Sequence, residues 1–174
     1  MLVFLLGLRC HLLVRASSQF PVRWHKVLDC WLQQRGLVRQ YPHVPGVDFA
    51  GEVINSRDSR FAPGDKVIMA GFRGGENRWG GFATRANEKA DWLVKVPQGM
   101  TTRETQALGT AGFTAMQSIM RLEENGMTPD GGEVLVTGAG GGVGSVAVVL
   151  LARRGYQVAA ATGRSEIATY LTEL

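Results

Sequence analysis

The clearest pattern of hydrophobic and polar positions lies in the last third of the chain. Residues 134–136 form a short apolar run of the β-branched kind found in buried parallel strands. Residues 137–144 follow and hold too much glycine for the interior of a strand or a helix. An apolar run over 145–154 then ends in two arginines before Gly155, which is typical of a helix C-terminus. With a second apolar strand over 157–162, the pattern predicts a βαβ unit.

The middle of the chain has a different pattern, with short strand-like runs separated by glycine and proline. Strands are predicted at residues 46–54, 66–70, 82–87 and 92–96. The glycine-rich stretch 71–81 is predicted to be a long flexible loop. Short strands with such turns favour a small, partly open β-barrel.

Two helical segments connect these parts. Thr101 and Glu104 have the spacing of a capping box, which predicts a helix start there. Gly109 is predicted to break the helix, a second helical segment covers 113–125, and Gly126 is suited to its C-cap.

Composition sets limits on function. The chain has 174 residues, of which 45% are hydrophobic, which is enough for one ordinary domain or two small ones. Its formal net charge of +4 is concentrated in residues 1–40, so the near-neutral remainder argues against a nucleic-acid-binding surface there. Cys10 and Cys30 have no metal-site spacing, which favours a reduced, cytoplasmic location.

The opening of the chain shows no organised period. The first apolar run is interrupted by charges, is too short to span a bilayer and lacks the basic start of a signal peptide. We therefore leave residues 1–36 unassigned, as an aberrant or disordered segment, and expect no membrane association. The mixture of tryptophans and basic residues there leaves RNA binding open as an alternative.

The glycine turn of the βαβ unit predicts dinucleotide binding. Without Cβ atoms the backbone can approach a pyrophosphate closely, and the following helix presents free N–H groups to it. An NAD site usually has an acidic residue after the second strand, but no carboxylate precedes Glu166. Arg164, flanked by the hydroxyls of Thr162 and Ser165, instead offers a cation for a 2′-phosphate, which favours NADPH. The alternatives are a purely structural turn and a solvated arginine.

Six motifs in order carry a family resemblance: VPGVDFAGEV, PGDKV, GGENRWGGFAT, DWLVKVPQGM, GTAGFTAM and VLVTGAGGGVG. They resemble the medium-chain dehydrogenase/reductase superfamily, and within it the zinc-free quinone oxidoreductase group of the acryloyl-CoA reductase type. The resemblance covers about residues 37–174. It implies an α/β fold in which a GroES-like β-barrel portion (37–125) is followed by the first βαβ unit of a Rossmann nucleotide-binding domain (126–174).

The resemblance also implies an activity and a set of cofactor-binding residues. The activity is NADPH-dependent reduction of an activated C=C bond in an enoyl-CoA, enone or quinone, by relatives that are homo-oligomers. Asn77 and Arg78 are placed at the substrate cleft by loop analogy. The residues implied to bind the cofactor are Gly138, Gly140, Gly141, Gly142, Val143, Gly144, Thr162, Gly163 and Arg164, with Thr110 and Thr114 near the nicotinamide.

Three departures from the family pattern limit these expectations. The zinc ligands of other superfamily members are missing, so no metal is expected, and hydrogen-bond donors would polarise the substrate carbonyl. The Asn-Tyr-Lys-Asp motif expected before Tyr41 is also missing, which leaves the catalytic residues unknown and suggests an altered reading frame or start upstream of Gly36. The chain ends at Leu174, early in the next helix, so we expect an incomplete form, with its inactivity an open alternative.

Two other classes of function compete with this interpretation. The turn also fits short-chain dehydrogenases, but those enzymes begin with this unit and carry a later Tyr-x-x-x-Lys pair, which is missing here. A non-enzymatic NADPH- or RNA-binding protein is the third hypothesis. A small-molecule substrate remains the partner that the resemblance implies.

Overall fold

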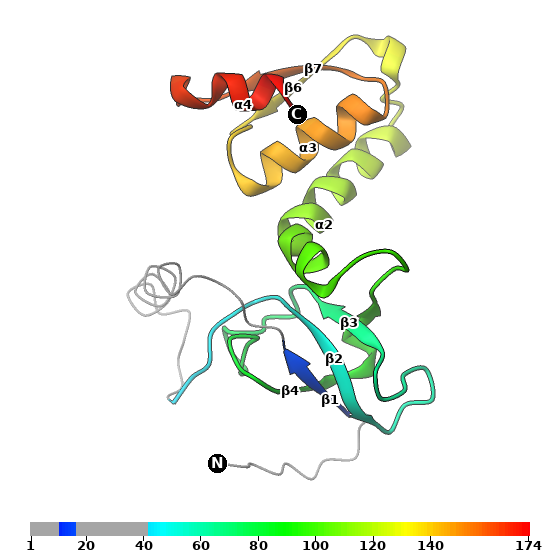
Figure 1. Cartoon of the computed structure of the whole chain (residues 1–174). Helices are drawn as coiled ribbons and strands as arrows, with labels where there is room; N and C mark the ends of the chain where they lie inside the picture. The colour runs from blue at the N-terminus through cyan, green and yellow to red at the C-terminus, as the bar shows by residue number, and fades with distance from the viewer. Residues whose placement is uncertain (1–10, 17–41) are drawn as a thin grey trace. The chain divides into compact units, whose positions relative to one another are not determined.

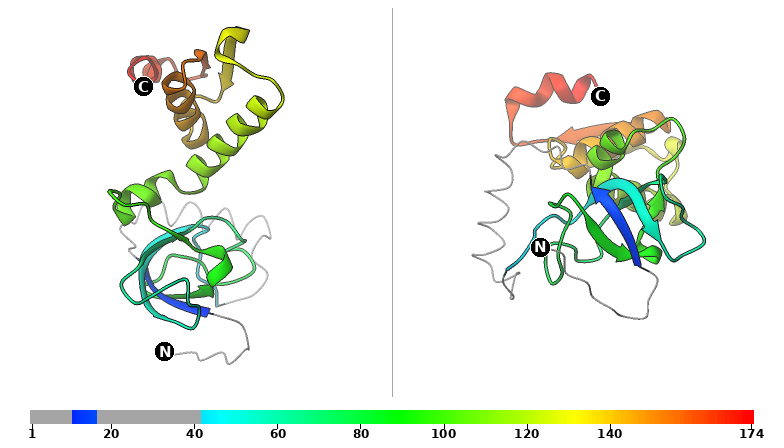
Figure 2. Two further views of the ribbon diagram at one scale, coloured as in Figure 1. Left: turned by 90° about the vertical axis from the view of Figure 1, so that its right-hand side faces the viewer. Right: turned by 60° about the horizontal axis from the view of Figure 1, so that its bottom comes forward.

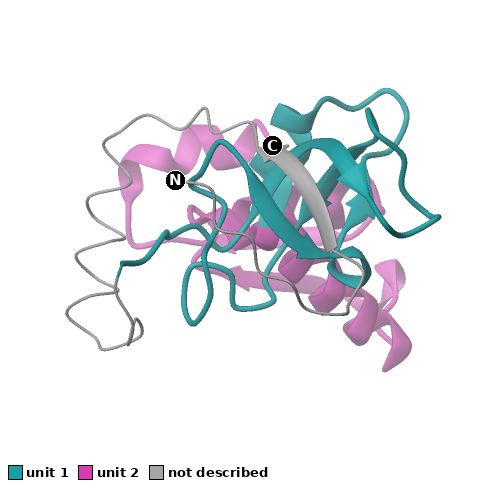
Figure 3. Ribbon diagram, turned by 90° about the horizontal axis from the view of Figure 1, so that it is seen from below, with its two compact units in different colours: residues 1–109 teal, residues 110–174 magenta. Residues whose placement is uncertain are grey.

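The computed structural model describes residues 11–16, as backbone, and 42–174, and the chain divides into two compact units (Figure 3). The first unit ends at Gly109 and the second comprises Thr110–Leu174. This division lies within a helix, whereas the sequence predicts a domain boundary after residue 125. In the described part of the chain no helix is both long and apolar enough to cross a membrane.

The first unit is built on one antiparallel sheet of five strands. They are β1 (His11–Ala16), β2 (Phe49–Ser56), β3 (Lys66–Met69), β4 (Ala86–Lys89) and β5 (Val94–Lys95), in the spatial order β4-β1-β2-β3-β5. The strands curve around one another, as two further views show (Figure 2). This confirms the predicted barrel-like arrangement of short strands.

Strand β1 lies within residues 1–36, the segment that is left unassigned from the sequence. It lies between β2 and β4, with Leu12 opposite Ser56 in β2 and Glu88 in β4 (Figure 1). The register with β2 shifts between Leu13 and Val14, which is a bulge. The other predictions for residues 1–10 and 17–36 lie outside the described residues.

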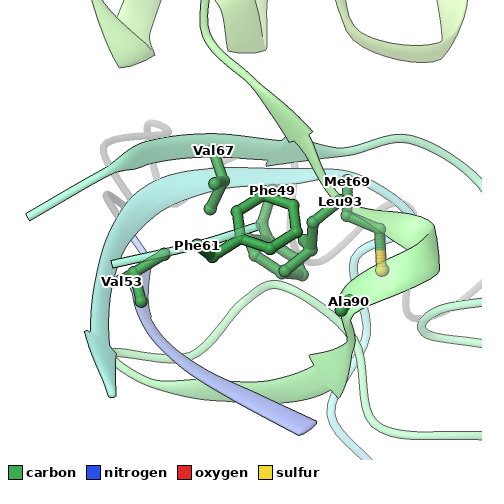
Figure 4. Packing of buried hydrophobic residues seen from close by; sticks show 7 residues of the cluster. All are labelled: Phe49, Val53, Phe61, Val67, Met69, Ala90 and Leu93. Atoms are coloured by element: carbon green, nitrogen blue, oxygen red, sulfur yellow. The ribbon is translucent and has the colours of Figure 1, made fainter. Parts of the chain in front are cut away.

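The core of the first unit lies inside the curved sheet. Figure 4 shows its side chains pointing toward one another from β2, β3 and the segments that follow them. Val67 and Met69 have no exposed surface at all. The seven buried members are Phe49, Val53, Phe61, Val67, Met69, Ala90 and Leu93.

Two strand boundaries differ from the prediction. β4 covers Ala86–Lys89 rather than 82–87, and a 3₁₀ turn η1 (Ala90–Trp92) takes up the start of the predicted strand 92–96. The β-branched residues that favour a strand are few in this region, so pairing with β1 decides the boundary.

The stretch 71–81, predicted to be a flexible loop, is held in place by backbone contacts with the segment before β2. The N–H groups of Gly80 and Gly81 donate to the carbonyls of Val44 (2.6 Å) and Gly46 (2.8 Å). A Cβ on Gly80 would overlap the Gly46 carbonyl oxygen, so the two backbones are in direct contact. These glycines therefore allow close packing of the loop against the segment before β2.

Helix α2 (Thr102–Glu124) begins and bends where the sequence predicts. The N–H of Thr101 donates to the Glu104 carboxylate at 2.8 Å, and the N–H of Glu104 donates to Thr101 Oγ1 at 3.2 Å, which is the predicted capping box. Gly109 has φ 42° and ψ −145°, which interrupts the helical path. A Cβ there would lie 2.8 Å from Asp48 Oδ2, so the bend requires glycine for space as well as conformation.

The second unit contains the predicted βαβ arrangement. Strand β6 (Glu133–Thr137), helix α3 (Gly142–Arg153) and strand β7 (Gln157–Ala161) follow one another after the 3₁₀ turn η2 (Pro129–Gly131), and β6 and β7 pair in parallel. The short elements η3 (Ser165–Ile167) and α4 (Ala168–Thr172) come next.

Packing in the second unit explains why these elements form. Ile119 of α2 is 2% exposed and belongs to one cluster with Val136, Val148, Leu151 and residues of the neighbouring elements.

Helix α3 begins three residues earlier than predicted, within the glycine stretch, and ends before Gly155 (φ 86°) as predicted.

Candidate nucleotide-binding site

The glycine turn between β6 and α3 is fixed by three features of its own backbone. Gly138 has φ 61°, a conformation that favours glycine. The N–H of Gly141 donates to the Gly138 carbonyl at 2.9 Å, and the N–H of Ala139 donates to the carbonyl of Ala161, at the end of β7, at 3.1 Å. The turn is thereby tied to the carboxyl ends of both parallel strands, where open α/β sheets bind ligands.

Gly144 brings the first turn of α3 against this loop. It is buried, and a Cβ on it would overlap the Gly138 carbonyl oxygen. The N-cap of α3 is Gly141, which has no side chain to satisfy the first helical N–H groups. Gly142 and Val143 are exposed, so this helix start offers N–H donors and its positive dipole end to solvent.

Arg164 and Thr162, predicted to select NADPH, lie at the same turn. The N–H of Arg164 donates to Thr162 Oγ1 at 3.1 Å, and the Arg164 guanidinium donates to the Gly140 carbonyl at 2.8 Å. A Cβ on Gly140 would overlap the end of the Ile167 side chain and approach the Arg164 guanidinium, so a larger residue there would displace these side chains. Arg164 and Gly163 are exposed. The structure therefore brings the predicted turn and the predicted cation together.

The predicted nicotinamide-side residues lie on α2. Thr110 and Thr114 are one helical turn apart and face the same side of the helix. Ala111, beside Thr110, approaches the turn, because a Cβ on Gly142 would lie 3.4 Å from the Ala111 Cβ. The start of α2 in the second unit is therefore next to the glycine turn.

A polar network that the sequence did not reveal joins α2 to the βαβ unit. Arg154 donates two hydrogen bonds to the Glu123 carboxylate, at 2.9 and 2.7 Å, and the Tyr156 hydroxyl lies 3.1 Å from both Glu123 Oε1 and the Met127 carbonyl. The bonds from Arg154 lower the pKa of Glu123, while burial and the Glu123 bond raise the pKa of Tyr156. In the sequence, the one hint of this network is the pair of arginines at the end of α3. Arginines at that position indicate a helix C-terminus and do not identify a hydrogen-bond partner.

In the first unit, the predicted substrate-side residue Arg78 lies on an aromatic ring. Its guanidinium carbon is 4.0 Å from the centre of the Trp92 ring, and Asn77 is exposed. His43 Nε2 lies 2.7 Å from the Gly75 carbonyl, which gives this histidine a structural contact. Within residues 42–174 no three His, Cys, Asp or Glu side chains gather in a way that could hold a metal ion.

Comparison with known proteins supports the same assignment for both units. Residues 14–98 match the alcohol dehydrogenase GroES-like domain. The acrylyl-CoA reductase AcuI of Ruegeria pomeroyi is 63% identical over 139 residues, which cover 80% of this chain and 42% of that protein. The solved yhdH oxidoreductase of Salmonella enterica in complex with NADP has a TM-score of 0.82 and 46% identity, over 95% of this chain and 50% of that one.

The chain belongs to the medium-chain dehydrogenase/reductase superfamily. Bacillus subtilis yhfP, a further relative solved with NAD bound, has a TM-score of 0.79 and 43% identity over 93% of this chain and 49% of that one. The chain spans about half the length of these solved relatives. Its match to this superfamily includes the last part of β1, which the sequence-based resemblance did not reach.

Proposed function

We propose that this chain is part of an NADPH-dependent oxidoreductase that reduces an activated C=C bond, with an acryloyl-CoA-like thioester as substrate and a quinone or enone as the alternative. The observation that carries the proposal is the meeting of the glycine turn with Arg164 in one βαβ unit. The named function of the Ruegeria relative and the NADP in the Salmonella relative support it.

The fit of these residues to a dinucleotide rests on the space and the donors that the turn provides. Gly140, Gly141, Gly142, Val143 and Gly144 would hold the pyrophosphate at the start of α3, where N–H groups are exposed. Arg164, with Thr162 and Gly163, would bind the 2′-phosphate. When bound, the nicotinamide supplies the hydride, and Thr110 and Thr114 are proposed to lie beside it.

The same proposal includes the domain assignment 37–125 for the catalytic part and 126–174 for the nucleotide-binding part. It also includes a cytoplasmic location and, for the longer relatives, homo-oligomers. The match of residues 14–98 to a GroES-like domain favours this function over a short-chain dehydrogenase, in which the nucleotide unit comes first.

The test is NADPH binding to the purified chain, followed by nicotinamide fluorescence with NADH as the control ligand. Replacing Arg164 by alanine is expected to weaken NADPH binding about ten-fold, since a charge-assisted contact to phosphate is worth roughly 1.4 kcal/mol or more. NADH binding should change by no more than about two-fold, because it has no 2′-phosphate.

Arg153→Ala provides a matched control. Arg153 is also exposed and lies at the opposite end of α3, so both ligands should bind this variant as they bind the unaltered chain. If the folded chain binds neither dinucleotide, or if Arg164→Ala weakens NADH as much as NADPH, the proposed cofactor site is wrong.

A further inference from the structure

The loop that precedes β4 has a strained backbone. Phe72 and Arg73 are consecutive non-glycine residues with φ of 53° and 60°, in the left-handed region. This conformation is unfavourable for a residue with a side chain and persists only where the surrounding structure fixes it. The conformation of this loop is therefore imposed by contacts elsewhere.

The side chain of Trp92 contacts residues near both ends of this loop. The rings of Phe72 and Trp92 stack with their centres 5.3 Å apart and their planes 19° from parallel. The Arg78 guanidinium carbon lies 4.0 Å from the centre of the same ring, and the Lys89 ammonium nitrogen lies 4.5 Å from it. Trp92 thus fixes the place of two cations and of the strained end of the loop.

Arg78 forms no ion pair with any other residue of the described ranges. Its Nε is buried and makes no hydrogen bond to any residue that the structure describes, although the side chain is only half-buried. The charge of Arg78 acts on the carboxyl group of Glu88, whose pKa is raised to about 7 by burial, so that Glu88 offsets the charge of Arg78 only in part at neutral pH. A buried N–H group without an acceptor is costly, so a ligand that supplies an anionic oxygen to the Arg78 guanidinium would be favoured.

Arg73, in the same loop, shows the opposite arrangement. Its Nε lies 3.3 Å from the Glu76 carboxylate, and its side chain is 71% exposed. The contrast indicates that Arg78 is not simply one of several solvated loop arginines.

We propose that Arg78, with Lys89 beside it on Trp92, binds a phosphate group of an acyl-CoA substrate and so favours an anionic thioester over a neutral quinone. This inference rests on the proposed function and names its substrate class. A guanidinium offers a phosphate paired donors, and the Lys89 ammonium over the same ring adds a second positive charge. The exposed rings of Phe72 and Trp79 add flat surfaces of the kind on which a nucleotide base stacks.

The test measures coenzyme A binding to the full chain by calorimetry, in saturating NADPH so that the glycine turn is occupied. Arg78→Gln is expected to weaken coenzyme A binding about ten-fold. Arg73→Gln is the matched control and should change the affinity by less than about two-fold, because its charge is solvated and already paired. Pantetheine, which lacks the phosphates, should bind the unaltered chain and both variants equally weakly.

Salt adds a second readout. Coenzyme A affinity of the unaltered chain should fall as salt rises from about 50 to 200 mM, and the affinity of Arg78→Gln should fall much less. Arg78→Lys keeps the charge without the planar guanidinium and should bind with intermediate affinity, which keeps the inference testable if the glutamine variant does not fold.

Three results would overturn the inference: no coenzyme A binding by the folded chain, equal affinities of the two glutamine variants, or pantetheine binding as tight as coenzyme A. NADPH binding separates this failure from failure of the proposed function. If the chain still binds NADPH and Arg164→Ala still weakens that binding, the reductase proposal stands and the proposed role of Arg78 is wrong.

Discussion

Glu88 offers a prediction in which burial of one carboxyl group sets the pH dependence of stability. It is in β4, only 6% exposed, and accepts no recorded hydrogen bond from a described residue. Burial raises its pKa from 4.5 to about 7, although the charges of Arg78 and Lys89 act in the opposite direction. We predict that the free energy of unfolding falls as pH rises through this range.

The sign follows from proton counting. Between the unfolded pKa near 4.5 and the folded pKa near 7, the folded state holds a proton that the unfolded state has lost, so raising the pH favours unfolding. The shift from 4.5 to about 7 is about 2.5 pKa units, and each unit corresponds to about 1.4 kcal/mol, which gives at most about 3.5 kcal/mol across the whole range. Screening by solvent at the strand edge reduces this to roughly 2 kcal/mol.

Urea unfolding at a series of pH values between about 4 and 9 measures this effect, with Glu88→Gln as the variant that cannot ionise. Stability of the unaltered chain should fall relative to the variant by roughly 2 kcal/mol over that range, and the other titrating groups cancel in the difference. Glu52→Gln, at an exposed position of β2, is the matched control and should run parallel to the unaltered chain. A constant difference between the unaltered chain and Glu88→Gln would refute the reasoning.

Three further substitutions test packing and capping. Thr101→Ala removes both hydroxyl contacts to Glu104 and should lower the free energy of unfolding by about 1 kcal/mol in urea titration; an unchanged midpoint would contradict the cap. Gly144→Ala places a methyl group onto the Gly138 carbonyl, so NADPH binding should be lost, whereas Gly131→Ala, at an exposed position outside the candidate site, should retain it. Tyr156→Phe removes the hydroxyl between Glu123 and Met127 and should destabilise the chain by about 1 kcal/mol in thermal unfolding, with the exposed Tyr170→Phe unchanged.

Features determined by neighbouring residues could be predicted from the sequence. The capping box of Thr101 and Glu104, the bend at Gly109 and the helix end before Gly155 each depend on a few consecutive residues. The βαβ unit was predictable for the same reason, since each element carries its own pattern and the connections are short.

Features determined by distant residues could not be predicted. β1 exists because its backbone pairs with two strands far along the chain, and the apolar stretch around it has no clear period of its own. The loop 71–81 is held by carbonyls of Val44 and Gly46, which glycine content alone cannot indicate.

The candidate site shows the same division. The glycine turn and Arg164 were identified because their chemistry lies in one short stretch. The stacking of Arg78 on Trp92 could not be identified from the sequence, because it depends on the path of the loop relative to the segment that contains Trp92.

The central place of β1 in the sheet bears on how the first unit folds. β2 and β3 are close in sequence and can pair early, and β5 can join them by a short connection. In the part of the sheet that the structure describes, β4 pairs with β1 and with none of those three strands. Closing the described sheet requires two long-range pairings made by one short strand, so we expect the pairing of β1 to be slower than that of β2 with β3. A chain that lacked it would expose unpaired edges on both β2 and β4, where edge-to-edge association begins.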